Sequence, residues 1–176
     1  KGWEVASFTK YLSIIGGGTP KTSNPNFWSE EIPFFTPKDI GDTYYSLKTE
    51  KNISALGLKA CSSKLLDIGT VFVTARGTVG KVAMAGIPMA MNQSCYAVIS
   101  EKYSQEFVHQ LTLSTVERLK NKASGAVFDA IVTRDFDAEA SILPPEEVAN
   151  IFTNIIKPIY KCILFNVKQS QTLAKI

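Results

Sequence analysis

The sequence has little of the chemistry from which metal and disulfide sites are built. It has one histidine, His109, and three cysteines, Cys61, Cys95 and Cys162, which lie far apart and form no Cys-x-x-Cys pair. An odd number of widely spaced cysteines argues against a disulfide framework, and so few Cys and His residues argue against a zinc site. We therefore expect no metal ion and a reducing compartment, the cytoplasm.

Long apolar runs and a strong excess of one charge are also missing. No run approaches the length of a membrane span and no secretory signal pattern opens the chain, so no membrane contact is expected. The net charge is only +3 over 176 residues. Residues 1–88 carry ten Lys/Arg and seven Asp/Glu, net +3, whereas residues 89–176 carry nine of each. Any basic surface is therefore expected in the first half of the chain.

Short strand-like segments dominate the chain up to Leu143. Ser54 is expected to cap a short helix through Lys59, and Ser104 a helix over 105–121. Residues 8–15 could form one or two helical turns, and Gly- and Pro-rich residues 16–26 form the clearest loop. Strands are expected at 3–8, 32–36, 69–75, 81–85, 94–100, 126–132 and 140–143. This pattern predicts an α+β domain, residues 1–143, of short and mostly antiparallel strands with few helices.

The end of the chain, residues 144–176, predicts one long amphipathic helix that begins after Pro144-Pro145 and contains Pro158, which should kink it. Its apolar stripe requires a partner helix, or the helix continues beyond Ile176 in a longer parent chain. Residues 145–176 would span roughly 48 Å, on the order of 14 base pairs of duplex. The expected helix interface comprises Val148, Ile151, Phe152, Ile155, Ile159, Ile163, Val167 and Leu173.

The segment TARGTVGKV, residues 74–82, raises the question of a nucleotide-binding loop. A P-loop requires Gly-x-x-x-x-Gly-Lys followed by Ser or Thr and a helix. Ala75 stands at the first glycine position, Val82 at the hydroxyl position, and the residues after Lys81 alternate like a strand. We expect a Gly-rich hairpin that approaches DNA closely, with Arg76 holding a phosphate or a guanine edge. A plain hairpin with exposed cations is the alternative.

No catalytic residue is expected. His109 lies in a helical pattern and is expected to be partly exposed, and no Ser, Cys or Thr has an activating context. The acidic residues of DFDAE, 135–139, could bind magnesium, but without a second acidic motif they favour a solvated turn. NPNF, residues 24–27, is similar to the Asn-Pro-Pro-aromatic loop of adenine methyltransferases, yet it lacks the second proline and favours a turn.

Four blocks of sequence, in order, resemble the specificity (S) subunit of type I restriction-modification systems. Residues 2–40 resemble the opening of its target recognition domain, with Gly-Gly-Thr-Pro, Ile-Pro-aromatic and Lys-Asp-Ile motifs. Residues 69–100 resemble the second block, with an Arg-Gly-Thr-x-Gly-Lys turn and an Asn-Gln strand, and 124–136 the third. Residues 142–152 resemble the junction into the conserved spacer helix, although Val148 replaces a usual Gln.

The resemblance implies a DNA-reading protein without catalysis or cofactor of its own. It would read one half of a split target in double-stranded DNA. Its long helix would set the gap between half-sites and dock methyltransferase (modification) subunits that bind S-adenosylmethionine. Restriction subunits that use ATP and magnesium would join through that complex. Family members usually carry two recognition domains and two helices, so this chain would be half of a subunit, or a half-subunit that dimerises.

Two further interpretations stay open: the recognition domain of a fused type II restriction-methyltransferase enzyme, and a scaffold that acts only through its helix. For DNA recognition, the candidates are the polar residues of the two Gly-rich loops and their neighbours. These are Thr19, Lys21, Thr22, Ser23, Lys38, Arg76, Thr78, Lys81, Asn92 and Gln93.

Overall fold

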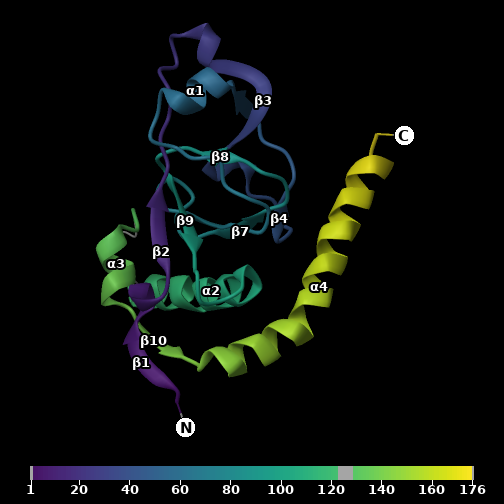
Figure 1. Ribbon diagram of the computed structural model, residues 1–176. Helices are drawn as coiled ribbons and strands as arrows, with labels where there is room; N and C mark the ends of the chain where they lie inside the picture. The colour runs from purple at the N-terminus through teal and green to yellow at the C-terminus, as the bar shows by residue number, and fades with distance from the viewer. Residues whose placement is uncertain (1, 123–128, 176) are drawn as a thin grey trace.

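The computed structural model describes residues 2–122 and 129–175, and its strands form three small sheets (Figure 1). One sheet pairs β1 (Glu4–Ser7) with β10 (Ala140–Leu143). The central sheet has the order β2 (Ser13–Gly16), β9 (Cys95–Ile99), β6 (Val71–Thr74), β7 (Val82–Ala85), β4 (Tyr45–Ser46). The third has the order β5 (Lys51–Ile53), β3 (Trp28–Phe35), β8 (Ala90–Met91). Among the described strands all pairs are antiparallel except β3 with β8 and β4 with β7. The predicted α+β class is confirmed.

The central strand β6 is buried on both faces, which explains its uninterrupted apolar sequence. Val71 and Val73 belong to the larger hydrophobic cluster, together with residues of α2 (Gln105–Lys122) that covers this face of the sheet. Phe72 points the other way and stacks on Phe35 with ring centroids 4.6 Å apart. The core is thus divided by the central sheet, and the third sheet closes the side away from α2 (Figure 1).

Both predicted helix caps are present. The Ser54 hydroxyl accepts the N–H of Gly57 at 3.0 Å and begins α1 (Ala55–Lys59). The Ser104 hydroxyl accepts the N–H of Phe107 at 3.3 Å at the start of α2. A cap satisfies an N–H that the first helical turn leaves free.

Some local predictions differ from the structure in whole or in part. Only Phe8–Lys10 forms a single 3-10 turn in the segment 8–15, because the residues that follow pair with β9 as strand β2. Residues 133–138 form a short helix, α3 (Thr133–Ala138), where a turn was expected. Of the strand predicted at 126–132, residues 126–128 lie outside the described part, and Ala130 makes an isolated bridge with Arg76.

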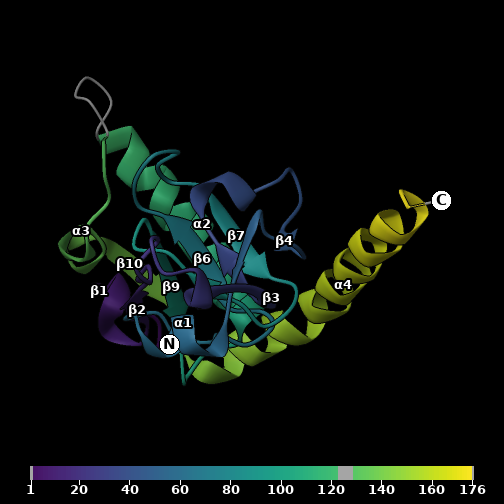
Figure 2. The ribbon, with the colours of Figure 1, turned by 90° about the horizontal axis from the view of Figure 1, so that it is seen from above.

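The predicted long helix is α4 (Glu146–Leu173), and it bends near its middle, where Pro158 lies (Figure 1). Its first half packs against α2: the Ser104 and Thr153 hydroxyls are 2.9 Å apart, and the Phe107 and Phe152 rings meet edge to face. Its second half runs up beside the domain toward the C-terminus (Figures 1 and 2).

A buried polar contact fixes α4 at its bend. His109 of α2 is fully buried, so the expectation of partial exposure was wrong. Its Nδ1 lies 2.6 Å from the Tyr160 hydroxyl, which also accepts a hydrogen bond from Gln110 Nε2 at 2.6 Å. Burial lowers the pKa of His109 to about 4 and raises the pKa of Tyr160 to about 12. Both groups are therefore neutral at pH 7. A neutral hydrogen-bonded pair costs less to bury between α2 and α4 than a charged group would.

Candidate nucleic-acid interface

The segment TARGTVGKV forms the predicted strand–turn–strand between β6 and β7. The Thr74 hydroxyl donates to the Thr78 carbonyl and accepts the N–H of Lys81 at 2.9 Å, so one side chain closes the turn. Gly77 and Gly80 have φ values of +80° and +72°, which side chains rarely adopt. Because a strand and not a helix follows Lys81, the turn has no helix N-terminus with which to cradle a nucleotide phosphate.

The backbone around Arg76 is held from both sides. The Ala75 N–H donates to the Ser94 carbonyl at 2.7 Å, and the Ala75 carbonyl accepts the N–H of Ile131 at 2.9 Å. The Arg76 side chain is exposed and makes no hydrogen bond or ion pair with the residues that the structure describes. The chain therefore presents a free guanidinium, with its five donors, from a fixed position.

Parallel pairing of β3 with β8 brings two distant segments beside Arg76. Phe35 pairs with Met91 at the ends of the two strands, and the Asn92 N–H donates to the Phe35 carbonyl at 2.9 Å. Since the strands run in the same direction, the residues after each emerge at one edge of the sheet. Residues 36–38 and 92–94 thus meet there.

We call the resulting hollow the recognition cleft; its volume is about 460 Å³. Four predicted residues, Lys38, Arg76, Thr78 and Asn92, line it together. The other lining residues are Thr36, Pro37, Glu50, Lys51, Gly77 and Ser94.

A second hollow of about 450 Å³ adjoins the recognition cleft and shares Glu50 and Lys51 with it. The predicted residue Thr22 lines this second hollow together with Trp28. The Lys51 ammonium lies 5.8 Å from the centre of the Trp28 ring, a weak cation–π contact at a solvated site. The two hollows form one polar face across β5 and the neighbouring loops.

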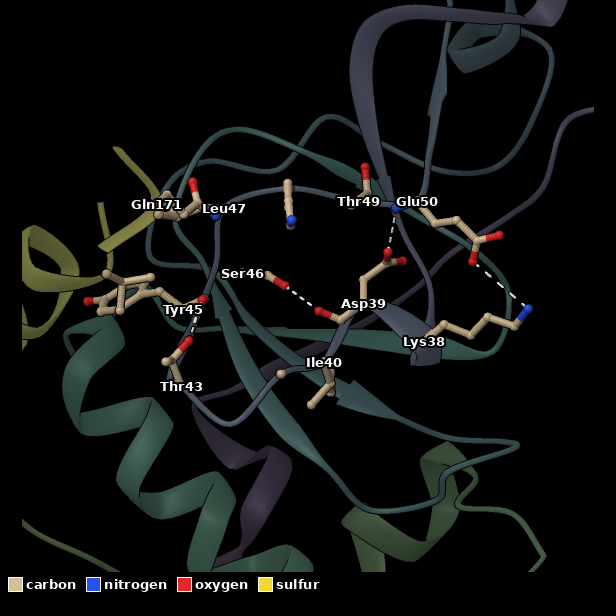
Figure 3. A pocket seen from close by; sticks show the side chains of 13 residues that line it. Lys38, Asp39, Ile40, Thr43, Tyr45, Ser46, Leu47, Thr49, Glu50 and Gln171 are labelled. Carbon is tan, nitrogen blue, oxygen red and sulfur yellow. Dashed lines mark hydrogen bonds and ion pairs between the residues drawn. The ribbon is translucent and has the colours of Figure 1, made fainter. Parts of the chain in front are cut away.

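Asp39 ties together the backbone segments that carry Lys38 and Glu50 (Figure 3). Its Oδ2 accepts the Thr36 N–H and the Thr36 hydroxyl, both at 2.7 Å, and its Oδ1 accepts the Glu50 N–H at 2.6 Å. Its backbone carbonyl accepts the Ser46 hydroxyl at 2.7 Å. Lys38 and Glu50 consequently extend from anchored backbone, and Figure 3 shows them reaching toward each other on the side away from α4.

Some of the predicted residues make hydrogen bonds within the protein, and others are exposed outside both hollows. The Thr19 hydroxyl donates to Gln93 Oε1, so this pair ties the first Gly-rich loop to the segment 92–94 that follows β8. Asn92 Oδ1 accepts the Ser94 N–H at 3.0 Å, which leaves its NH₂ group for a ligand. Lys21, Ser23 and Lys81 are exposed but line neither hollow.

Sequence reasoning missed Thr36, Glu50, Lys51 and Ser94 in the cleft. β5, which starts at Lys51, has only three residues and no alternation that would mark it as a strand. Lys-Asp-Ile at 38–40 was the one available signal, since its Asp39 is the residue that anchors Glu50.

Charge and hydrogen-bonding capacity suit this face to binding a polyanion. Lys38, Lys51 and Arg76 carry positive charge around the recognition cleft, and Glu50 is the carboxylate that faces them. Cations at a groove attract phosphates, and Arg and Asn side chains can pair with base edges. Among residues 2–122 and 129–175, no three His, Cys, Asp or Glu side chains converge as metal ligands.

The acidic cluster 135–139 is structural in its described contacts. Asp135 caps α3 by accepting the Val132 N–H at 2.7 Å, and Asp137 accepts the Thr9 hydroxyl at 2.5 Å. Glu139 is buried, and its carboxylate forms ion pairs with Arg118 Nε at 2.9 Å and with Lys122 Nζ at 2.6 Å. Burial opposes its ionisation, yet hydrogen bonds from the two cations lower the pKa of Glu139 overall. The expected solvated turn is thus partly buried.

α4 exposes an apolar stripe along its length. Six of the predicted interface residues are exposed on it, while Ile163 is half-buried against the domain's own cluster and Val167 lies beside Thr43. The six are Val148, Ile151, Phe152, Ile155, Ile159 and Leu173.

By length and composition alone, α4 is also the one helix in the described part of the chain that could cross a membrane. That is weak evidence, because Lys157, Lys161 and Lys168 lie within the helix. A one-sided stripe is typical of helix pairing.

The sequence is similar to a known protein family and to several curated proteins. Residues 1–175 match the model of a family described as type I restriction modification DNA specificity domain. The chain is 30% identical over its whole length to 42% of the type I restriction enzyme MjaIX specificity subunit of Methanocaldococcus jannaschii. It is 29% identical, again over its whole length, to 39% of the HindI specificity subunit of Haemophilus influenzae. The chain thus spans about two fifths of these curated relatives.

Solved structures share the fold. The HsdS subunit from Thermoanaerobacter tengcongensis superposes with a TM-score of 0.64 at 21% identity, covering 97% of this chain and 40% of that one. A type I restriction-modification S subunit from M. genitalium gives 0.58 at 7% identity, covering 97% and 44%. Residues that form the sheets and the long helix α4 therefore occur together in these solved folds.

Proposed function

The chain belongs to the type I restriction-modification DNA specificity family, and from this premise we propose that it reads one half of a split DNA target as a specificity subunit or half-subunit. The observation that carries the proposal is the recognition cleft, which Lys38, Lys51 and Arg76 line together. Arg76 has no hydrogen-bond or ion-pair partner among the residues that the structure describes. Cations supply affinity for the phosphates, and Arg76 and Asn92 supply donors for base edges.

The chain performs no chemistry in this proposal. Modification subunits that bind S-adenosylmethionine dock beside the long helix, and restriction subunits that use ATP and magnesium join through that complex. The chain itself binds no cofactor, and it works in the cytoplasm, where the DNA is.

α4 would pair with a second such helix, either from another part of a longer parent chain or from a second copy. The exposed apolar side chains of α4 support this part of the proposal, since Ile151, Ile155, Ile159 and Leu173 are more than half exposed within residues 2–122 and 129–175. The alternative, a recognition domain of a fused type II enzyme, is not favoured, because both curated relatives are named as specificity subunits.

A selection experiment tests the proposal. The protein, in complex with its modification subunit, is incubated with duplexes that contain a randomised region, and bound duplexes are sequenced at two salt concentrations. We expect a defined set of bases to be enriched, with affinity that falls steeply as salt rises. Equal recovery of all sequences would contradict the proposal. The double variant Lys38→Ala, Arg76→Ala serves as the control that lacks the main cleft cations.

A further inference from the structure

Glu50 stands at the centre of the polar face. It lines the recognition cleft, the second hollow and a third hollow, of about 480 Å³, that lies beside α4. Its carboxylate lies 3.9 Å from the Lys38 ammonium, and the two side chains are 57% and 80% exposed. No other carboxylate of the described residues lines the recognition cleft.

The position of Glu50 is not explained by stability. An ion pair this exposed and this long contributes little to folding. The tie to Asp39 uses the backbone N–H of Glu50, not its side chain. The fold therefore fixes the backbone from which the Glu50 side chain extends, without requiring a carboxylate at that position.

In a DNA-binding cleft the Glu50 carboxylate is expected to lower the affinity for DNA. Lys38, Lys51 and Arg76 attract phosphates there, and a negative charge among them weakens that attraction for every duplex. A carboxylate compensates only by accepting a hydrogen bond, because it has no hydrogen to donate when ionised.

The donors on the base edges determine which base can give a hydrogen bond to the Glu50 carboxylate. In the major groove, cytosine presents its N4 amino donor without an adjacent acceptor, whereas adenine presents its N6 donor beside the N7 acceptor. N7 would face one oxygen of the carboxylate and repel it. A glutamate is therefore matched to cytosine, as an arginine is to guanine.

Resting on the proposed function, we propose that Glu50 is a specificity-determining residue that accepts a hydrogen bond from the N4 amino group of a cytosine in the half-site. Arg76 lies in the same cleft and is suited to a guanine edge or a neighbouring phosphate. The half-site read by this domain then contains at least one obligatory cytosine.

The test uses the protein in complex with its modification subunit and the same randomised duplex pool. Glu50→Ala and Glu50→Gln are compared with the wild type and with Glu117→Gln, which removes the same charge from an exposed position on α2. We expect the wild type to select a cytosine at one position. Glu50→Ala should reduce the discrimination at that position by roughly 5- to 150-fold and leave the other positions unchanged. Glu50→Gln should admit adenine there, since an amide pairs with N6 and N7.

Two results overturn the inference. One is that both Glu50 variants keep every base preference of the wild type; the other is that they relax only a position that is not cytosine. A wild-type complex without any base preference would instead remove the proposed function, and the inference with it. Urea midpoints equal to that of the wild type show that the variants fold, as expected for an exposed side chain.

Discussion

The Asp39 carboxylate accepts the backbone N–H of Glu50 at 2.6 Å, across a separation of 11 residues. Its other oxygen accepts both donors of Thr36. Hydrogen bonds to a carboxylate are roughly twice as strong as neutral ones. One side chain behind the recognition cleft thereby sets the spacing between the turn that bears Lys38 and the segment that bears Glu50.

Replacing Asp39 by Ala should impair both folding and binding. The Thr36 and Glu50 N–H groups lose their acceptor, so we expect the free energy of unfolding to fall by about 1–3 kcal/mol, as measured in urea. Duplex affinity should fall as well, although Asp39 itself does not line the recognition cleft. Asp42→Ala removes a nearby exposed carboxylate and is the control. Equal effects of the two substitutions would contradict the bracing role.

Lys38 and Arg76 should give different kinds of binding defect. Lys38→Ala should weaken binding to all duplexes alike and reduce the salt dependence by about one phosphate contact, because an ammonium holds charge without reading a base. Arg76→Ala should cost about 1–3 kcal/mol on the preferred sequence and relax one base position if its guanidinium reads a guanine. Titrations of preferred and scrambled duplexes at several salt concentrations measure both effects. Lys59→Ala, on α1 outside the cleft, is the control, and an unchanged affinity would remove Arg76 from the interface.

Much of the fold follows from local sequence. The period of three to four residues after Glu146 predicted α4, and Ser54 and Ser104 predicted the starts of α1 and α2. In each case the signal lies within one element. The strands β4, β5 and β8 have two or three residues each, and they exist only because a longer strand pairs with them. No local pattern could mark them.

The candidate site also combines features that local sequence predicts with features that depend on distant strand pairing. Its Gly-rich hairpin was predictable, because Gly77 and Gly80 mark the turn themselves. That Lys38 would stand beside Arg76 depends on the parallel pairing of β3 with β8, which no nearby residue encodes. The role of Glu50 depends in turn on Asp39.

Acid should destabilise the protein through His109. Its pKa is about 4 in the fold, against a usual value of 6.5, because of burial. Between these values the unfolded chain binds more protons than the folded one, so stability is complete above about pH 6.5 and is lost as the pH falls toward about 4. The loss should approach about 3 kcal/mol, at about 1.4 kcal/mol per pH unit. The Tyr160 hydroxyl, which lies 2.6 Å from His109 Nδ1, has a pKa raised to about 12 and does not titrate in this range.

Urea unfolding of the wild type and of His109→Asn, at pH 7 and at pH 5, isolates this effect. The asparagine keeps a polar group near the Tyr160 hydroxyl but does not titrate. We expect the wild type to lose more stability than the variant between the two pH values. Parallel losses would show that His109 is not the group responsible, since carboxylates titrate in both proteins.

Self-association should depend on the exposed stripe of α4. Ile155 and Ile159 are 66% and 55% exposed, so replacing both by Ser should leave the stability of the monomer nearly unchanged. If the stripe pairs with a second helix, the same change removes apolar area from that interface and should weaken association by about 1–3 kcal/mol per side chain. Self-association is measured by light scattering or sedimentation over a range of protein concentrations, with Asn154→Ser on the same helix as the control. Identical dissociation constants for the two variants would show that α4 uses another face, and the half-buried side with Ile163 would then be the one to change.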